Sequence, residues 1–108
     1  MEEEHEITVK DLKRLLDSGV HVNLIDVREP HEYDFCHIAD SRLVPVRQIP
    51  DHVNEFNLNE EYVFYCHVGE RSGWAVNFLR QLGFKKVRNL LGGVDAWAIE
   101  IDPTMPRY

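Results

Sequence analysis

The sequence predicts an α/β fold built on a mostly parallel central sheet with helices on both faces. Two short runs, 22–27 and 62–65, are almost continuously apolar, which is typical of strands that are covered on both sides. Apolar residues recur at helical spacing in other segments, such as 9–16 and 75–82. Strands that alternate with helices in this way form crossover units, which make neighbouring strands parallel.

The composition predicts a single acidic domain. The chain of 108 residues has the length of one domain, and its formal net charge of -7 disfavours nucleic acid and anionic lipid as partners. We expect residues 1–6 to form a mobile acidic segment and residues 7–108 to form the domain. No apolar run approaches the roughly 20 residues that span a bilayer, and the first residues are acidic where a signal peptide is basic. We therefore expect a cytoplasmic protein with no membrane partner.

The first half of the chain is expected to hold five elements, in the order helix 9–16, strand 22–27, helix 30–35, strand 42–44 and a helix from residue 50. Thr8, with Asp11 three residues later, predicts a capped start for the first helix, and Gly19 predicts its stop. Pro30 and Pro50 suit the first turn of the two later helices, because an amide hydrogen is not needed there. The strands are predicted from their apolar runs.

The second half is expected to hold four elements, in the order strand 62–65, helix from residue 71, strand 86–90 and helix 94–99. A polar turn over 57–61 precedes the first of these strands. Gly83 is a candidate C-cap for the long helix that follows. Gly92 and Gly93 separate the last strand from the final short helix, which carries Trp97.

Cys66 is the candidate nucleophile, because ligands of parallel sheets bind beyond the carboxyl ends of the strands. It directly follows one predicted strand, and Asp26 and Arg28 lie at the end of another. A thiol is a useful nucleophile only as a thiolate, so its site must supply positive potential. Four residues between Cys66 and Arg71 are enough to turn backbone amides inward as an anion-binding nest, next to a helix N-terminus.

The remaining loop residues are assigned to the active-site loop and to substrate binding: His67, Val68, Gly69, Glu70, Arg71 and Ser72. Gly69 permits a tight turn, and His67 and Arg71 bring cationic groups. Glu70 would oppose a thiolate if it pointed inward, so we expect it to face solvent. The alternative is that Cys66 is a buried structural thiol, which is the commoner role of an isolated cysteine. Its position between a strand and a helix favours the reactive role.

Four blocks of this sequence resemble a single rhodanese domain: residues 26–33, 36–38, 66–72 and 91–97. The resemblance runs from about Ile7 to the last residue. It implies the rhodanese-like fold and a sulfurtransferase in which Cys66 takes a sulfane sulfur from a donor, holds it as a persulfide and passes it to a nucleophilic acceptor. It implies no metal and no organic cofactor. The donor would be thiosulfate or a protein persulfide.

The resemblance also implies that Asp26 and Arg28 support the loop, a role that the strength of a carboxylate–guanidinium pair favours over a catalytic one. Arg71 would hold the anionic group of the donor or the loop itself. Cys36 is either a resolving thiol for Cys66 or a packing residue, and we favour packing. Each cysteine is directly followed by a histidine, which is not the spacing of zinc motifs, so we expect no metal site.

Two other functions stay open from the sequence. Cysteine phosphatases of similar fold have five residues between cysteine and arginine, whereas this chain has four between Cys66 and Arg71, which suits a single sulfur atom better. A non-catalytic interaction or sensor module would not need an intact Cys66 and Arg71. Glu70 and the absence of a loop lysine disfavour dianionic thiosulfate as the donor. Residues 101–108 resemble the tail of rhodanese domains fused to adenylyltransferases, which implies a ubiquitin-like sulfur carrier as a candidate partner.

Overall fold

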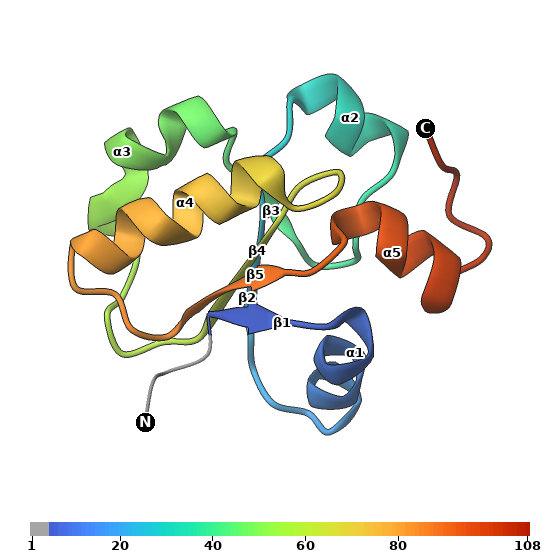
Figure 1. Cartoon of the computed structure of the whole chain (residues 1–108), viewed down its shortest axis with the longest axis horizontal. Coiled ribbons are helices and arrows are strands. Elements are labelled where there is room, and N and C mark those ends of the chain that lie inside the picture. The colour runs from blue at the N-terminus through green and yellow to red at the C-terminus, as the bar shows by residue number, and fades with distance from the viewer. Residues whose placement is uncertain (1–4) are drawn as a thin grey trace.

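The computed structural model describes residues 5–108 as a parallel sheet with helices on both faces (Figure 1). The strands are β1 (Glu6–Ile7), β2 (Asn23–Asp26), β3 (Arg42–Leu43), β4 (Tyr62–Tyr65) and β5 (Val87–Leu90). Their order in the sheet is β1-β5-β4-β2-β3, and each neighbouring pair is parallel. The predicted α/β class with a parallel sheet is confirmed.

Helices cover the two faces of the sheet in pairs. They are α1 (Val9–Asp17), α2 (Pro30–Phe35), α3 (Ile49–His52), α4 (Glu70–Gln81) and α5 (Gly93–Glu100). Residues of α3 and α4 share one buried cluster with the sheet, and residues of α1 and α5 share the other (Figure 1). The short helix α2 follows β2. None of the helices in residues 5–108 is long and apolar enough to cross a membrane.

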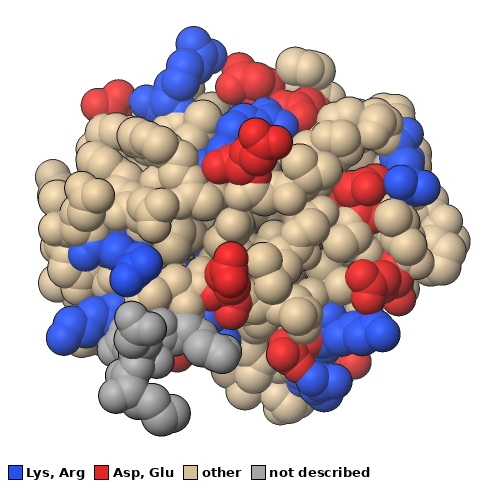
Figure 2. Space-filling model, viewed as in Figure 1, with Lys and Arg blue, Asp and Glu red and all other residues tan. Residues whose placement is uncertain are grey.

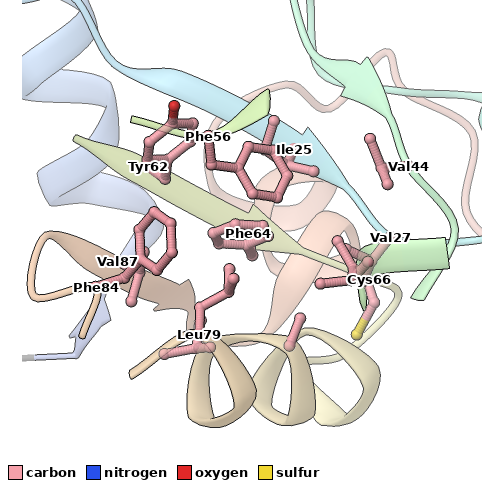
Figure 3. Close-up of a cluster of buried hydrophobic side chains, with 13 residues drawn as sticks. Ile25, Val27, Val44, Phe56, Tyr62, Phe64, Cys66, Leu79, Phe84 and Val87 are labelled. Atoms are coloured by element: carbon pink, nitrogen blue, oxygen red, sulfur yellow. The ribbon is translucent and has the colours of Figure 1, made fainter. Parts of the chain in front are cut away.

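The strand β4 lies in the middle of the sheet, and all four of its residues are buried. Tyr62 and Phe64 pack in the cluster beneath α3 and α4 (Figure 3). Val63 and Tyr65 pack in the cluster beneath α1 and α5. Because both faces are covered, the strand needs an apolar side chain at every position, which explains its continuous apolar run. Cys66 comes next and contributes to the α4 side of the core (Figure 3).

Several predicted boundaries are confirmed by the structure. The Thr8 hydroxyl accepts a hydrogen bond from Asp11 N at 3.1 Å and caps α1. The bounds of α2 and β4 are those expected from the sequence. The helix expected from residue 50 is instead three short pieces: a 3-10 turn over Val46–Gln48, α3, and a second 3-10 turn over Val53–Glu55. Phe56 follows this stretch in extended conformation, and its ring packs edge-to-face against Tyr62 and Phe64.

The N-terminal edge of the sheet differs from the expectation of a mobile segment over residues 1–6. Residues 1–4 of that segment lie outside the described residues. Glu6 belongs to β1, where it is paired with Asn89 of β5, and His5 lies 3.2 Å from the Val87 carbonyl through its Nδ1 atom. A two-residue strand has no apolar run of its own, so only its partner β5 could reveal it.

Acidic and basic side chains are interspersed on the face shown in Figure 2, several of them side by side. Ion pairs between partly exposed groups include Arg88 with Glu61 at 3.0 Å and Arg107 with Asp95 at 2.8 Å. Such pairs contribute little to stability individually, because water and salt screen them.

Candidate active site

Cys66 begins the loop that leads from β4 into α4. The residue is 1% exposed, and its Sγ atom accepts hydrogen bonds from Gly69 N at 3.1 Å and Ser72 N at 3.5 Å. Gly69 has a φ of +112°, a conformation that glycine adopts readily, and this turns its amide toward the sulfur. The loop therefore directs backbone N–H groups at Sγ, as an anion-binding nest does.

The helix α4 starts at Glu70, one residue before the expected start at Arg71. Its N-terminus lies next to the sulfur, so the helix dipole adds positive potential there. Glu70 is exposed, which confirms the expectation that it faces solvent. Val68 is also exposed, at the outer side of the loop. The side chains of Val68 and Glu70 thus face solvent, whereas the backbone amides of Gly69 and Ser72 face the sulfur of Cys66.

Asn89 of β5 anchors the loop from below, and the sequence reasoning missed it. Its Nδ2 atom donates to the Gly69 carbonyl at 3.0 Å, and its Oδ1 atom accepts from the Ser72 hydroxyl at 2.6 Å. The single Ser72 hydroxyl proton has a second acceptor in reach, Sγ of Cys66 at 3.3 Å. The signal in the sequence was an uncharged polar side chain within the predicted strand 86–90. Asn89 therefore fixes both sides of the nest.

The start of α5 holds the other end of the loop. Val94 N donates to the Cys66 carbonyl at 2.9 Å, and Asp95 N donates to the His67 carbonyl at 3.1 Å. Gly93 makes this approach possible, because a Cβ atom on it would lie 2.4 Å from the Cys66 carbonyl oxygen. Two helix N-termini, those of α4 and α5, thus meet around Cys66 and its neighbour.

Asp26 and Arg28 form a fully buried pair at the end of β2. Arg28 donates to both carboxylate oxygens of Asp26, with Nη2 at 2.6 Å, and the same nitrogen donates to the Cys36 carbonyl at 2.6 Å. Its Nη1 atom donates to the Tyr108 hydroxyl at 2.8 Å. Burial opposes the charge of Arg28, but its hydrogen bonds to Asp26 and Tyr108 outweigh this effect and raise its pKa. The pair joins β2 to the segment after α2 and to the last residue.

Arg71 is engaged by Glu32 of α2, a residue that the sequence reasoning did not single out. The two Nη atoms of Arg71 donate to the two carboxylate oxygens of Glu32 at 2.7 and 3.1 Å. Glu32 also accepts from Glu29 N at 3.0 Å and from the Tyr108 hydroxyl at 2.7 Å. Four hydrogen bonds therefore end on one carboxylate, and the edge of the Arg71 guanidinium that its two Nη atoms form is paired with Glu32.

The last residues fold back over this site. The ring of Tyr108 stacks on that of His67 with centroids 4.1 Å apart, and its edge meets Phe35 at 5.7 Å. Arg107 pairs with Asp95 of α5 at 2.8 Å. A sequence reading cannot bring Tyr108 to Glu32, which is 76 positions away. Residues 101–108, which resemble the tail of fused rhodanese domains, therefore end against His67 of the loop.

The sequence comparison with known families decides the classification. Residues 8–100 match the family described as the rhodanese-like domain. The chain belongs to the rhodanese-like domain family. The four sequence blocks that resemble rhodanese lie within the matched residues, so the resemblance is confirmed.

Relatives of this rhodanese-like domain include larger proteins. It is 37% identical over 92 residues to the putative sulfur carrier protein YrkF of Bacillus subtilis, covering 85% of this chain and 50% of YrkF. It is 38% identical over 104 residues to the probable adenylyltransferase/sulfurtransferase MoeZ of Mycobacterium tuberculosis, covering 94% of this chain and 26% of MoeZ. The chain thus spans half the length, or less, of these relatives.

A solved structure agrees with the fold along the whole rhodanese-like domain. The rhodanese-like domain protein of Staphylococcus aureus superposes with a TM-score of 0.83 and 33% identity, covering 100% of this chain and 99% of that one. The predicted rhodanese-like fold is therefore confirmed. The similarity extends over the Cys66 loop as well as over the sheet.

The second cysteine of the rhodanese-like domain, Cys36, packs on the other side of the sheet from Cys66. Cys36 and Cys66 are both free and buried, and they lie in different core clusters. Within residues 5–108 no three His, Cys, Asp or Glu side chains are grouped to hold a metal ion. A large surface hollow is lined in part by residues of α1 and β2, and its lining includes no cysteine.

The Glu32 carboxyl is expected to titrate far below its usual range. The Arg71 hydrogen bonds, with smaller contributions from Glu29 N and Tyr108, lower the pKa of Glu32 from 4.5 to about 2 against the opposing effect of burial. A lowered folded-state pKa stabilises the fold fully above about pH 4.5, and this contribution is lost as the pH falls toward 2.

We therefore expect the free energy of unfolding of Glu32→Gln to fall less steeply with acid than that of the parent. Denaturant titrations between these two pH values measure the difference. Carboxyl NMR shifts report the pKa of Glu32 directly. A Glu32 carboxyl that titrates near its ordinary value of 4.5 would contradict the ion pair with Arg71.

Proposed function

We propose that this rhodanese-like domain is a sulfurtransferase that carries a sulfane sulfur as a persulfide on Cys66. The observation that carries the proposal is the nest around Sγ, in which Gly69 N and Ser72 N approach at 3.1 and 3.5 Å. A thiolate and a terminal persulfide are both anions, and the same donors can stabilise either one. Two relatives support this role, one named a putative sulfur carrier and the other a sulfurtransferase.

The proposed loading step forms one S–S bond and breaks another. The Cys66 thiolate attacks the outer sulfur of thiosulfate, and the electron pair of the broken S–S bond leaves with sulfite. Thiolate and thiosulfate carry three negative charges together, as do the persulfide anion and sulfite. In the second step a nucleophilic acceptor such as cyanide attacks the terminal sulfur, forms thiocyanate and returns the Cys66 thiolate.

The other residues of the site act in this scheme by positioning. Ser72 and Asn89 hold the nest in shape, and the buried pair of Asp26 and Arg28 supports it from β2. His67 stacks on Tyr108 and does not act as a second nucleophile. The donor is thiosulfate or a protein persulfide, and the physiological acceptor is a small nucleophile or a ubiquitin-like sulfur carrier, as the fused adenylyltransferase of MoeZ suggests.

Mass spectrometry of the sulfur-loaded protein tests the proposal. After incubation with thiosulfate, or with a persulfide donor, the peptide that contains Cys66 is expected to gain one sulfur atom that cyanide removes as thiocyanate. Cys36→Ser is the matched control, because it removes the other buried thiol and should leave loading intact. Cys66→Ser should keep the fold and lose loading.

Two results would overturn the sulfurtransferase proposal. One is an unmodified Cys66 after exposure to all of these donors, which would favour a non-catalytic binding module. The other is sulfur found on Cys36 with none on Cys66. Hydrolysis of an aryl phosphate that depends on Cys66 would point to a phosphatase instead.

A further inference from the structure

We propose that Glu32 sets the sulfur-donor preference of this domain by keeping the Arg71 guanidinium away from small anionic donors. The inference rests on the proposed sulfur transfer and concerns the choice of substrate at the same site. Glu32 would be a specificity-determining residue that acts through Arg71, without touching the reacting sulfur. The class of donor it disfavours is the small dianion, of which thiosulfate is the example.

The first step of the argument is the state of Arg71. This residue is the one cation of the loop itself apart from the titratable His67, and it would be the natural ligand for the sulfonate of thiosulfate. The edge formed by its two Nη atoms, which suits bidentate binding of an anion, is instead paired with the two carboxylate oxygens of Glu32. The Glu32 side chain is only 11% exposed, whereas that of Arg71 is 36% exposed. Water therefore weakens this pair less than a surface pair.

The second step is that Glu32 cannot easily turn away to release Arg71. Its Oε1 atom also accepts from Glu29 N, in the capping box that starts α2. Its Oε2 atom also accepts from the Tyr108 hydroxyl, which in turn is fixed by Arg28. The carboxylate is thus tied to the start of one helix and to the last residue of the chain. A small anion must compete with a partner that is already in place.

The third step concerns the other charges around the loop mouth. An apolar hollow beside the loop is lined by Val46, Arg47, Glu70, Arg71 and Trp74. Arg47 lies 3.2 Å from Glu29, with its side chain 80% exposed, so it offers only a weak and screened charge. Glu70 adds a negative charge at the rim. A donor that binds this hollow through apolar contacts, and that carries no negative charge next to the sulfur it transfers, is therefore favoured over a dianion such as thiosulfate.

Steady-state kinetics of Glu32→Gln test this inference. Glutamine at this position keeps the capping box of α2 but cannot pair with both Nη atoms of Arg71. We expect kcat/KM for thiosulfate to rise about tenfold, mainly through a lower KM, because a released charged hydrogen-bond donor binds the anion before and during reaction. With cysteamine persulfide, which carries an ammonium group, the change is expected to stay within about twofold.

Asp34→Asn is the matched control for the loss of one negative charge. Asp34 lies two residues after Glu32 in the same helix, α2, and is exposed. Its effect on the KM for thiosulfate is expected to be less than about threefold, because the exposed charge is screened. An equal gain in Asp34→Asn and Glu32→Gln would show a general charge effect and would overturn the proposal.

The double variant Glu32→Gln, Arg71→Gln is expected to lose the gain with thiosulfate, because the gain requires a free guanidinium. If this double variant keeps the gain, the proposal is wrong. It is also wrong if Glu32→Gln lowers kcat with both donors, since Glu32 would then only support the loop. If Glu32→Gln does not fold, Glu32→Asp provides the same comparison, because its shorter side chain cannot reach both Nη atoms. Failure of the parent to load sulfur from any donor would instead refute the sulfurtransferase function itself.

Discussion

Replacing Arg28 with methionine is expected to lower the free energy of unfolding by about 3–5 kcal/mol. Arg28 and Asp26 are both fully buried, and the guanidinium contacts both carboxylate oxygens. Methionine fills much of the same space but leaves the Asp26 carboxylate without its counter-charge. It also leaves the carbonyl of Cys36 and the hydroxyl of Tyr108 without a donor. An uncompensated buried charge is among the costliest defects that a single substitution can create.

Urea unfolding of three variants separates the buried charge from the lost contacts. In Asp26→Leu, Arg28→Met both charges are gone, and we expect the double variant to be more stable than Arg28→Met alone. Arg88→Met is the matched surface control. This substitution breaks the ion pair between Arg88 and Glu61, whose side chains are 25% and 41% exposed, respectively. It should lower the free energy of unfolding by at most about 1 kcal/mol. If Arg28→Met cost no more than Arg88→Met, the buried pair would not stabilise the fold.

Much of the fold could be predicted because its strands and caps leave local signals. The apolar run of β4 predicts a strand that is buried on both faces, and Thr8 followed by Asp11 predicts the start of α1. The strand β1 has no such signal, since its two residues are ordered by pairing with β5. The three short helical pieces around α3 leave no such signal either, and the ring contacts of Phe56 with Tyr62 and Phe64 that follow them are tertiary.

The candidate site also has one part that local sequence signals could predict and another part that depends on tertiary contacts. Cys66 and the loop up to Ser72 are contiguous in sequence, so their spacing and the glycine at position 69 could indicate a nest. Glu32 of α2 and Asn89 of β5 reach the loop through side-chain hydrogen bonds over 39 and 17 positions. Tyr108 stacks on His67 of the loop and donates to Glu32, 76 positions away. Spacing arguments apply within an element and cannot identify partners at such separations. The identity of the residues that contact the loop from other elements therefore emerges only from the three-dimensional structure.

Gly93→Ala is expected to destabilise the protein by at least about 3 kcal/mol, combining backbone strain with steric overlap. The added Cβ would lie 2.4 Å from the Cys66 carbonyl oxygen and 2.5 Å from that of His67. These are backbone atoms at the start of the loop, so they cannot rotate away as a side chain can. Either α5 or the loop must move, and the hydrogen bond from Val94 N to the Cys66 carbonyl is lost.

Gly19→Ala isolates the backbone part of this cost. Gly19 has a φ of +83°, and a Cβ on it would meet no atom within 4 Å, so the substitution should cost only about 1 kcal/mol. Gly93 has a φ of +58°, where the strain on alanine is no greater, so any excess in Gly93→Ala measures the contact with the loop. We expect that excess to appear in denaturant titrations, together with faster hydrogen exchange at Val94 N and loss of most sulfur loading on Cys66. Equal destabilisation of the two variants would show that the close approach of α5 to the loop is not what holds Cys66 in place.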